Sequence, residues 1–263
     1  MGKLSDLFTQ VRRARSGRGI GFVGKSTPAM KPRAAALLVE CNKIDGGNAE
    51  AAIKAGADGL IFAWSGQQKG SAEALRSAIE AAKAAGDGVL CGLDIAGNWD
   101  KLTRKDFEDF KELGVSFILL PLDAPARLLA MHVKDLEAVV SVPMRQGELY
   151  PVFIRNLSAF EHVAAIHLDF GLNNEVGAMS IEDALHYRAV REAVHAPALI
   201  HVQGTLDEAD GYTLLTLGIQ AVVLTEGKDS AATSQQIQAL HDLLESVHHD
   251  EKDSSTLGLN IKG

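Results

Sequence analysis

Short apolar runs rich in β-forming residues recur eight times along this 263-residue chain, and this repetition constrains its fold more than any other feature. Each run has the length of a buried strand and ends in polar or turn-forming residues. The runs are Ala35–Cys41, Leu60–Trp64, Val89–Ile95, Phe117–Leu122, Ala138–Pro143, Ala165–Phe170, Ala198–Gln203 and Ala221–Glu226. Eight strands of this kind predict a single sheet with both faces covered.

Helical patterns separate most of the runs. They span Asn48–Ala55, Ala72–Ala85, Arg104–Leu113, a short Ala126–His132, Ile181–Val194, Asp207–Leu217 and, after the last run, Ala232–Val247. The segment Glu148–Phe160 fits less well because Pro151 interrupts it. Strands that alternate with helices pair in parallel through right-handed crossovers. The pattern therefore predicts an α/β protein, a closed (β/α)8 barrel, with an open doubly wound sheet as the alternative.

Length and composition indicate one large domain, because barrels of this kind commonly run to about 250 residues and 46% of the residues are apolar. We expect the barrel over residues 34–247. A basic N-terminal helix and loop would precede it in residues 1–33, with the helix over Lys3–Arg15, and a mobile polar tail would follow in residues 248–263. Cys41 and Cys91 lie inside apolar runs, which predicts small buried side chains in a reducing compartment.

The charge distribution limits the kinds of binding partner that we expect. A net charge of −8 argues against nucleic acid, since phosphate neutralisation needs a basic surface. Residues 1–33 carry eight basic side chains against Asp6 alone, so this segment is +7 and the remainder −15. We favour a solvated helix face over an arm for an anionic partner. Neither a signal peptide nor an apolar stretch of roughly 20 residues is seen, which indicates a cytoplasmic protein. A homo-oligomer is compatible with the sequence.

Glycine turns follow the last two runs. Gly204-Thr205 comes after the seventh and Gly227-Lys228 after the eighth, with a helical pattern between them. A phosphate is bound by converging backbone N–H groups, a close backbone approach and a helix N-terminus. We therefore predict a phosphate site made by Gly204, Thr205, Gly227, Lys228 and Ser230. The single glycine after Gln203 and the nearby carboxylate of Glu226 weigh against it.

A second glycine-rich segment, Gly19–Ser26, matches the nucleotide-binding pattern G-x-x-x-x-G-K-[ST] letter for letter. That loop needs a buried strand before it and a helix that opens at the lysine. Here a basic segment precedes it, and Thr27-Pro28 follows directly. We interpret the segment as an edge piece that leads into the barrel.

Polar side chains stand at the ends of four predicted strands, and period-two alternation points them away from the helices. In a barrel they would point inward near the C-terminal mouth, where catalytic residues of such barrels lie. These candidate catalytic residues are Glu40, Asp94, His167, Asp169 and His201. They form a general acid–base set or a divalent-metal site. None of the eight runs contains a lysine, which disfavours a Schiff-base mechanism.

The glycine turns and the entry Gly56-Ala57-Asp58-Gly59 resemble those of aldolase-type, phosphate-binding TIM barrels. That superfamily includes enzymes of tryptophan and histidine biosynthesis, thiamine phosphate synthase and FMN-dependent oxidases. The resemblance spans roughly residues 34–247 and matches no single family. It implies a lyase or isomerase that acts on a small phosphorylated or carboxylated metabolite. An FMN-binding oxidoreductase, with Trp64 near the mouth, and a non-catalytic scaffold barrel are the alternatives.

Overall fold

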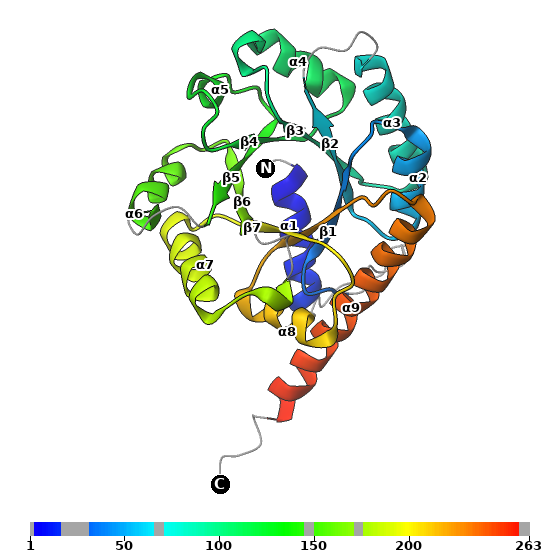
Figure 1. Ribbon diagram of the computed structural model, residues 1–263, viewed down its shortest axis with the longest axis vertical. Coiled ribbons are helices and arrows are strands. Elements are labelled where there is room, and N and C mark those ends of the chain that lie inside the picture. The colour runs from blue at the N-terminus through cyan, green and yellow to red at the C-terminus, as the bar shows by residue number, and fades with distance from the viewer. Residues whose placement is uncertain (1–2, 17–31, 66–70, 145–149, 171–175, 258–263) are drawn as a thin grey trace, which may run out of the picture.

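The computed structural model of the chain is a closed barrel of eight parallel strands in chain order, β1 to β8, with β8 paired to β1 (Figure 1). The structure describes residues 3–16, 32–65, 71–144, 150–170 and 176–257, without the side chains of 11–16, 150 and 249–257. The strands are β1 (Ala36–Cys41), β2 (Gly59–Trp64), β3 (Leu90–Ile95), β4 (Phe117–Pro121), β5 (Glu137–Pro143), β6 (Val163–Asp169), β7 (Ala198–Val202) and β8 (Ala221–Thr225). The predicted (β/α)8 barrel is confirmed, and the open doubly wound alternative is wrong because the sheet closes.

Helices connect successive strands and surround the barrel (Figure 1). They are α2 (Gly46–Lys54), α3 (Ser71–Ala85), α4 (Arg104–Leu113), α5 (Arg127–Ala130), α6 (Tyr150–Ile154), α7 (Ile181–Val194), α8 (Glu208–Leu217) and α9 (Ser230–Leu257), with α1 (Lys3–Ser16) before β1. Short 3-10 turns lie at Trp99–Lys101, Arg155–Ala159 and Val176–Ala178. No described helix combines the length and the apolarity needed to cross a membrane.

Local sequence signals explain several helix ends. Thr103, Ser180 and Asp207 each accept a hydrogen bond from the backbone N–H three residues later, which satisfies a donor that the first helical turn leaves open. Gly114 and Gly218 adopt left-handed backbone angles directly after α4 and α8, with φ of 101° and 64°. Glycine takes this conformation without steric cost, so these helices end where the chain must turn back toward the barrel.

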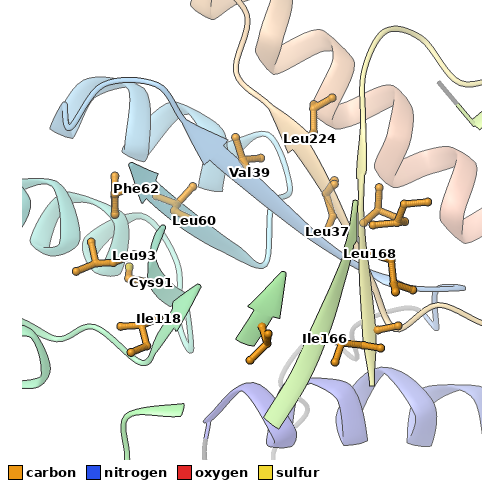
Figure 2. Packing of buried hydrophobic residues seen from close by; sticks show 14 of the residues in the cluster. Leu37, Val39, Leu60, Phe62, Cys91, Leu93, Ile118, Ile166, Leu168 and Leu224 are labelled. Atoms are coloured by element: carbon orange, nitrogen blue, oxygen red, sulfur yellow. The ribbon is translucent and has the colours of Figure 1, made fainter. Parts of the chain in front are cut away.

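The outer face of the strands carries the larger core. Alternate residues such as Leu37 and Val39 on β1, Leu60 and Phe62 on β2, and Ile166 on β6 point toward the helices (Figure 2). They are almost completely buried. Cys41 and Cys91 belong to the same layer, are unpaired, and have thiol pKa values that burial raises, to about 11 for Cys91. The prediction of buried cysteine side chains is confirmed.

A second core fills the barrel interior at the N-terminal ends of the strands. It joins inward residues of all eight strands to Leu4, Leu7 and Phe8 of α1. Glu137, at the start of β5, accepts hydrogen bonds from the Leu4 backbone N–H and the Ser5 hydroxyl, both at 2.8 Å. Helix α1 therefore closes one end of the barrel, as its position inside the ring of strands in Figure 1 shows.

The chain ends differ from the sequence predictions. Helix α1 runs to Ser16, one residue past its predicted end, and its apolar face is part of the barrel core. Helix α9 continues to Leu257. The predicted helix end at Val247 is wrong, because no glycine or proline follows Lys228 before Gly258 and His248 itself is buried. The mobility predicted for residues 248–263 stays a prediction. Residues 258–263 lie outside the described part of the chain.

Candidate active site at the barrel mouth

Four of the predicted catalytic residues lie on the inner barrel face toward the C-terminal ends of the strands. Glu40 comes from β1, Asp94 from β3, His167 from β6 and His201 from β7. Each follows a small or apolar inward residue two positions earlier, such as Leu38 before Glu40. Strand alternation therefore places an apolar layer below these side chains and leaves the polar groups facing the mouth.

Hydrogen bonds and one longer contact between a histidine and a carboxylate join residues of five strands into one polar chain. The Ser141 hydroxyl of β5 lies 2.8 Å from His167 Nδ1, and His167 Nε2 lies 2.6 Å from His201 Nδ1. His201 Nε2 lies 3.4 Å from Glu40 Oε2, within ion-pair distance but longer than a well-formed hydrogen bond. The Thr225 hydroxyl donates to the same Glu40 oxygen at 3.1 Å. We call Ser141, His167, His201 and Glu40 the relay.

One proton arrangement gives each contact of the relay a donor and an acceptor. A carboxylate accepts only, so His201 directs a protonated Nε2 toward Glu40 and accepts at Nδ1. His167 then donates from Nε2 and accepts the Ser141 hydroxyl at Nδ1. Burial, followed by the neighbouring His201, holds the pKa of His167 well below its ordinary value. A neutral His167 with two distinct nitrogens is what this arrangement requires.

The two mouth carboxyls have pKa values that move in opposite directions. The interaction with His201 is the largest influence on Glu40 and lowers its pKa, with a smaller contribution from the Thr225 hydroxyl. The pKa of Asp94 is raised from 3.8 to about 6, mainly by burial and next by the charge of Glu40, while His201 opposes the rise. At neutral pH, Glu40 is therefore ionised, whereas Asp94 titrates near pH 6. Such divergent pairs mark acid and base assignments in enzymes.

Asp169, the fifth predicted catalytic residue, lies on the same face of β6 as His167, one inward position nearer the open end. It is half-buried, and its backbone carbonyl accepts a hydrogen bond from the Met144 N–H at 2.7 Å. Its position suits a rim contact more than direct proton transfer at Glu40.

Ser141 and Thr225 belong to the site although the sequence reasoning missed them. Ser141 pairs in register with His167, and Thr225 with Glu40. The signal was present, because each is a polar residue at an inward position of an otherwise apolar strand. The five candidates predicted from the sequence are all ionisable, whereas Ser141 and Thr225 carry hydroxyl groups.

Glu226 also has a role that the sequence reasoning did not assign. Its buried carboxylate accepts hydrogen bonds from the Asn42 backbone N–H at 3.1 Å and the Asn48 side-chain amide at 2.7 Å. Its own backbone N–H donates to the Glu40 carbonyl at 2.8 Å. Desolvation by burial raises the pKa of Glu226. Glu226 therefore ties the end of β8 to the strand end that presents Glu40.

The predicted phosphate-binding residues fall into two halves. Gly204 has a φ of +77°, open space where a side chain would be, and borders a groove of about 310 Å³ between the β7–α8 loop and α9, which Thr205 also lines. Gly227 differs, because its N–H already donates to the Thr233 hydroxyl at 3.1 Å. The N–H of Ala231, next to Ser230 at the start of α9, donates to Asp229 at 3.0 Å. Lys228 is exposed.

Three further expectations concern other sites. Trp64 ends β2 at the mouth end of the barrel, but its side chain points outward and packs edge-on against Phe110 of α4, so it does not face the barrel interior. Among the described residues, the histidine and acidic side chains close enough to share a metal ion are His241, Asp242 and Glu245 on α9, away from the mouth. The nucleotide-binding pattern at Gly19–Ser26 lies outside the described residues.

No protein-family model and no curated protein matches the chain. Solved structures of the same architecture do. Phosphoribosyl anthranilate isomerase from Thermus thermophilus is 15% identical, with a TM-score of 0.57 over 81% of this chain and 99% of that chain. A tryptophan synthase structure from M. tuberculosis with a TrpA G66V substitution is 13% identical, with a TM-score of 0.64 over 93% of this chain and 100% of that chain.

The citrate synthase SbnG is 14% identical, with a TM-score of 0.53 over 84% of this chain and 95% of that chain. These neighbours are aldolase-type TIM-barrel enzymes. Identities of this size show the fold alone. The chain therefore shares their (β/α)8 architecture, and its activity has to be argued from its own residues.

Proposed function

We propose that the protein is an enzyme, a lyase or isomerase, that acts on a small phosphorylated or carboxylated metabolite by proton transfer at the barrel mouth. The observation that carries the proposal is the pair of interior carboxyls with divergent pKa values, Glu40 lowered and Asp94 raised to about 6. Two half-buried carboxyls at the same end of the barrel are costly to keep there, and such an arrangement favours a functional role. The isomerase and synthase among the structural neighbours support the general kind of reaction.

Glu40 is the general base and Asp94 the general acid. Glu40 is ionised, and His201 and Thr225 fix its orientation by contacts to Oε2, which leaves Oε1 to accept a proton from substrate carbon. Asp94, protonated below its pKa of about 6, donates to the oxygen on which negative charge develops. His167 and Ser141 are positioning residues, because they act through His201.

The anionic group of the substrate requires a separate contact, because the relay itself presents carboxylate to the mouth. The open backbone at Gly204 and Thr205 supports binding there, with the exposed Lys228 as a point charge. Gly227 and Ser230 are the weaker part of this assignment, since nearby N–H groups already donate within the protein. Asp169 would contact the substrate at the rim. The predicted cytoplasmic location stays a prediction.

Hydrogen exchange into deuterated water tests the proposal without knowledge of the substrate. Lyases and isomerases that remove a carbon-bound proton exchange it with solvent, so a panel of phosphorylated and carboxylated metabolites can be followed by proton NMR. We expect exchange of one metabolite by the wild type and a loss of about 100-fold or more in Glu40→Gln. Glu108→Gln, on the exposed face of α4, is the matched control. Exchange that Glu40→Gln retains would place the reaction at another site, and a wild type that exchanges none of the metabolites would favour a scaffold barrel.

A further inference from the structure

Ser141 is the end member of the relay, on the side away from Glu40. Its Oγ lies 2.8 Å from His167 Nδ1, within hydrogen-bond distance. His167 Nε2 lies 2.6 Å from His201 Nδ1, and His201 Nε2 lies 3.4 Å from Glu40 Oε2. The order along the relay is therefore hydroxyl, imidazole, imidazole and carboxylate. In the proton transfer proposed above, Ser141 acts only through His201, and its own hydroxyl takes no part.

This order is that of a serine nucleophile and its base. A serine hydroxyl becomes a nucleophile when an imidazole nitrogen accepts its proton and a carboxylate orients and stabilises the imidazole. In the relay each N–H points away from Ser141 and toward Glu40, so His167 Nδ1 is the accepting atom. The second imidazole, His201, connects the base to the carboxylate.

The protonation state of His167 suits a base. Its side chain is buried, and burial together with the neighbouring His201 holds its pKa well below the ordinary value. The imidazole is therefore neutral at neutral pH and able to accept a proton. Glu40 is ionised, and through His201 its negative charge stabilises the positive charge that His167 gains when it accepts a proton.

Solvent reaches the barrel interior at the level of the relay. Ser141 follows Val139 by two positions on the inner face of β5, and it is only half-buried whereas Val139 is fully buried. Ala63, which pairs in register with Asp94 and follows the inward Ile61 by two positions on β2, is exposed. A small molecule that enters the mouth can therefore contact the Ser141 hydroxyl.

We propose that Ser141 is a nucleophile and gives the protein a second activity, the hydrolysis of a small uncharged thioester or activated ester. Ser141 Oγ attacks the acyl carbon, and its proton moves to His167 Nδ1. The bond from the acyl carbon to sulfur or oxygen then breaks, and the leaving group takes this proton. Water attacks the acyl-serine with His167 again as base, and the water proton returns through His167 to the serine oxygen as the carboxylic acid departs.

The side chains around Ser141 select an uncharged acyl group. Glu40, Asp94 and Asp169 lie on the same inner face, and the eight described strands contain no lysine or arginine. A negatively charged acyl group would be repelled by the carboxylates there. The proposal depends on the relay geometry and not on the proton transfer at Glu40 Oε1, so it can fail while that reaction stands, and the reverse also holds.

A fluorophosphonate probe tests the nucleophile directly, because an activated serine displaces its fluoride and keeps the phosphonyl group. The full-length protein is incubated with the probe, and tandem mass spectrometry locates the label. We expect the label on Ser141 in the folded wild type and no label at this position in Ser141→Ala. Ser158→Ala, at an exposed position after α6, is the matched control and should be labelled at Ser141 like the wild type. Thermal melts followed by circular dichroism check that each variant folds.

Labelling rates test the base and its orientation. His167→Gln should be labelled at least about 100-fold more slowly, because its side chain cannot act as a base. Glu40→Gln should be at least about tenfold slower, and it carries this test if His167→Gln does not fold. Because the pKa of His167 lies well below 6.5, the wild-type rate should stay level from about pH 8 to about pH 5.5. S-phenyl thioacetate should release a burst of about one thiol per protein molecule in the wild type and none in Ser141→Ala.

Three results would overturn the proposal. A folded wild type without label on Ser141 would show that the hydroxyl serves only as a hydrogen-bond donor to His167. Labelling rates unchanged in both His167→Gln and Glu40→Gln would show that the relay does not activate the serine. A wild type that is labelled but releases no thiol from S-phenyl thioacetate would remove the hydrolase activity.

Discussion

Asp94→Asn should stabilise the protein, and the gain should depend on pH. Burial and the neighbouring Glu40 raise the pKa of this carboxyl from 3.8 to about 6. In the unfolded chain Asp94 ionises near its ordinary pKa, whereas the folded protein resists this ionisation. Asparagine keeps the shape of the protonated side chain and cannot ionise.

The magnitude follows from the difference between the two pKa values. About two pH units at 1.36 kcal/mol each amount to about 3 kcal/mol. Because the folded pKa is the higher one, the stability of the wild type is complete below pH 3.8 and falls as pH rises toward 6. The advantage of Asp94→Asn should therefore be about half developed at pH 5 and reach about 3 kcal/mol above pH 7.

Urea melts of the wild type and Asp94→Asn, at intervals between pH 4.5 and 8, measure this difference directly. Other titrating groups are common to both proteins and cancel in the comparison. Asp87→Asn, at an exposed position after α3, is the control and should show no trend. A difference between Asp94→Asn and wild type that stays constant with pH, or a variant that is less stable at pH 7, would refute the reasoning.

Three further predictions concern core packing at Gly92, the hydrogen bonds of Glu226 at the end of β8, and phosphate binding at Gly204. Gly92→Ala should lower the free energy of unfolding by about 1–3 kcal/mol in urea melts, because the added Cβ would lie 2.3 Å from the buried Phe117 ring. Gly47→Ala in α2, where an added Cβ has room, should leave the free energy of unfolding unchanged. Glu226→Ala should lower the free energy of unfolding by about 1–3 kcal/mol and slow any exchange activity, since the hydrogen bonds from Asn42 and Asn48 to the carboxylate are lost. Unchanged urea melts would contradict the role of Glu226 in holding the end of β8. Phosphate should raise the melting temperature of the wild type but not of Gly204→Val, and an equal rise in both would remove Gly204 from the site.

Much of the fold could be predicted because the apolar patterns are regular. All eight strands lie within two residues of the predicted ends, since strands covered by helices on one side and a packed interior on the other read as continuous apolar runs. The sequence does not predict helix α6, because Pro151 interrupts the helical pattern there. Proline is tolerated in the first turn of a helix, where its missing N–H has no partner to lose.

The place of α1 could not be read from its sequence. Leu4, Leu7 and Phe8 predict an amphipathic helix, but they are equally suited to any apolar surface. Only the closed barrel shows that they cover the inward layer around Phe117 and Val139. Spacing along one segment reveals a face, and tertiary structure decides what that face contacts.

The sequence predicts which residues belong to the candidate site better than it predicts which of them contact one another. Strand parity brought Glu40, Asp94, His167 and His201 to the same end of the barrel, and the structure places them there. The order of the relay depends on strand register and side-chain direction, which no single strand encodes. The divergence of the Glu40 and Asp94 pKa values likewise arises from burial and from His201, a residue about 160 positions away from Glu40.

The central claim is that Glu40 and Asp94 act as base and acid, and the pH dependence of solvent exchange tests it most directly. For the metabolite that exchanges, the wild-type rate should fall on the acid side as Glu40 is protonated and on the alkaline side above about pH 6 as Asp94 ionises. Asp94→Asn should be slower and should lose the alkaline fall, while Glu40→Gln should be inactive throughout. An alkaline fall that persists in Asp94→Asn, or a flat wild-type profile, would contradict the account.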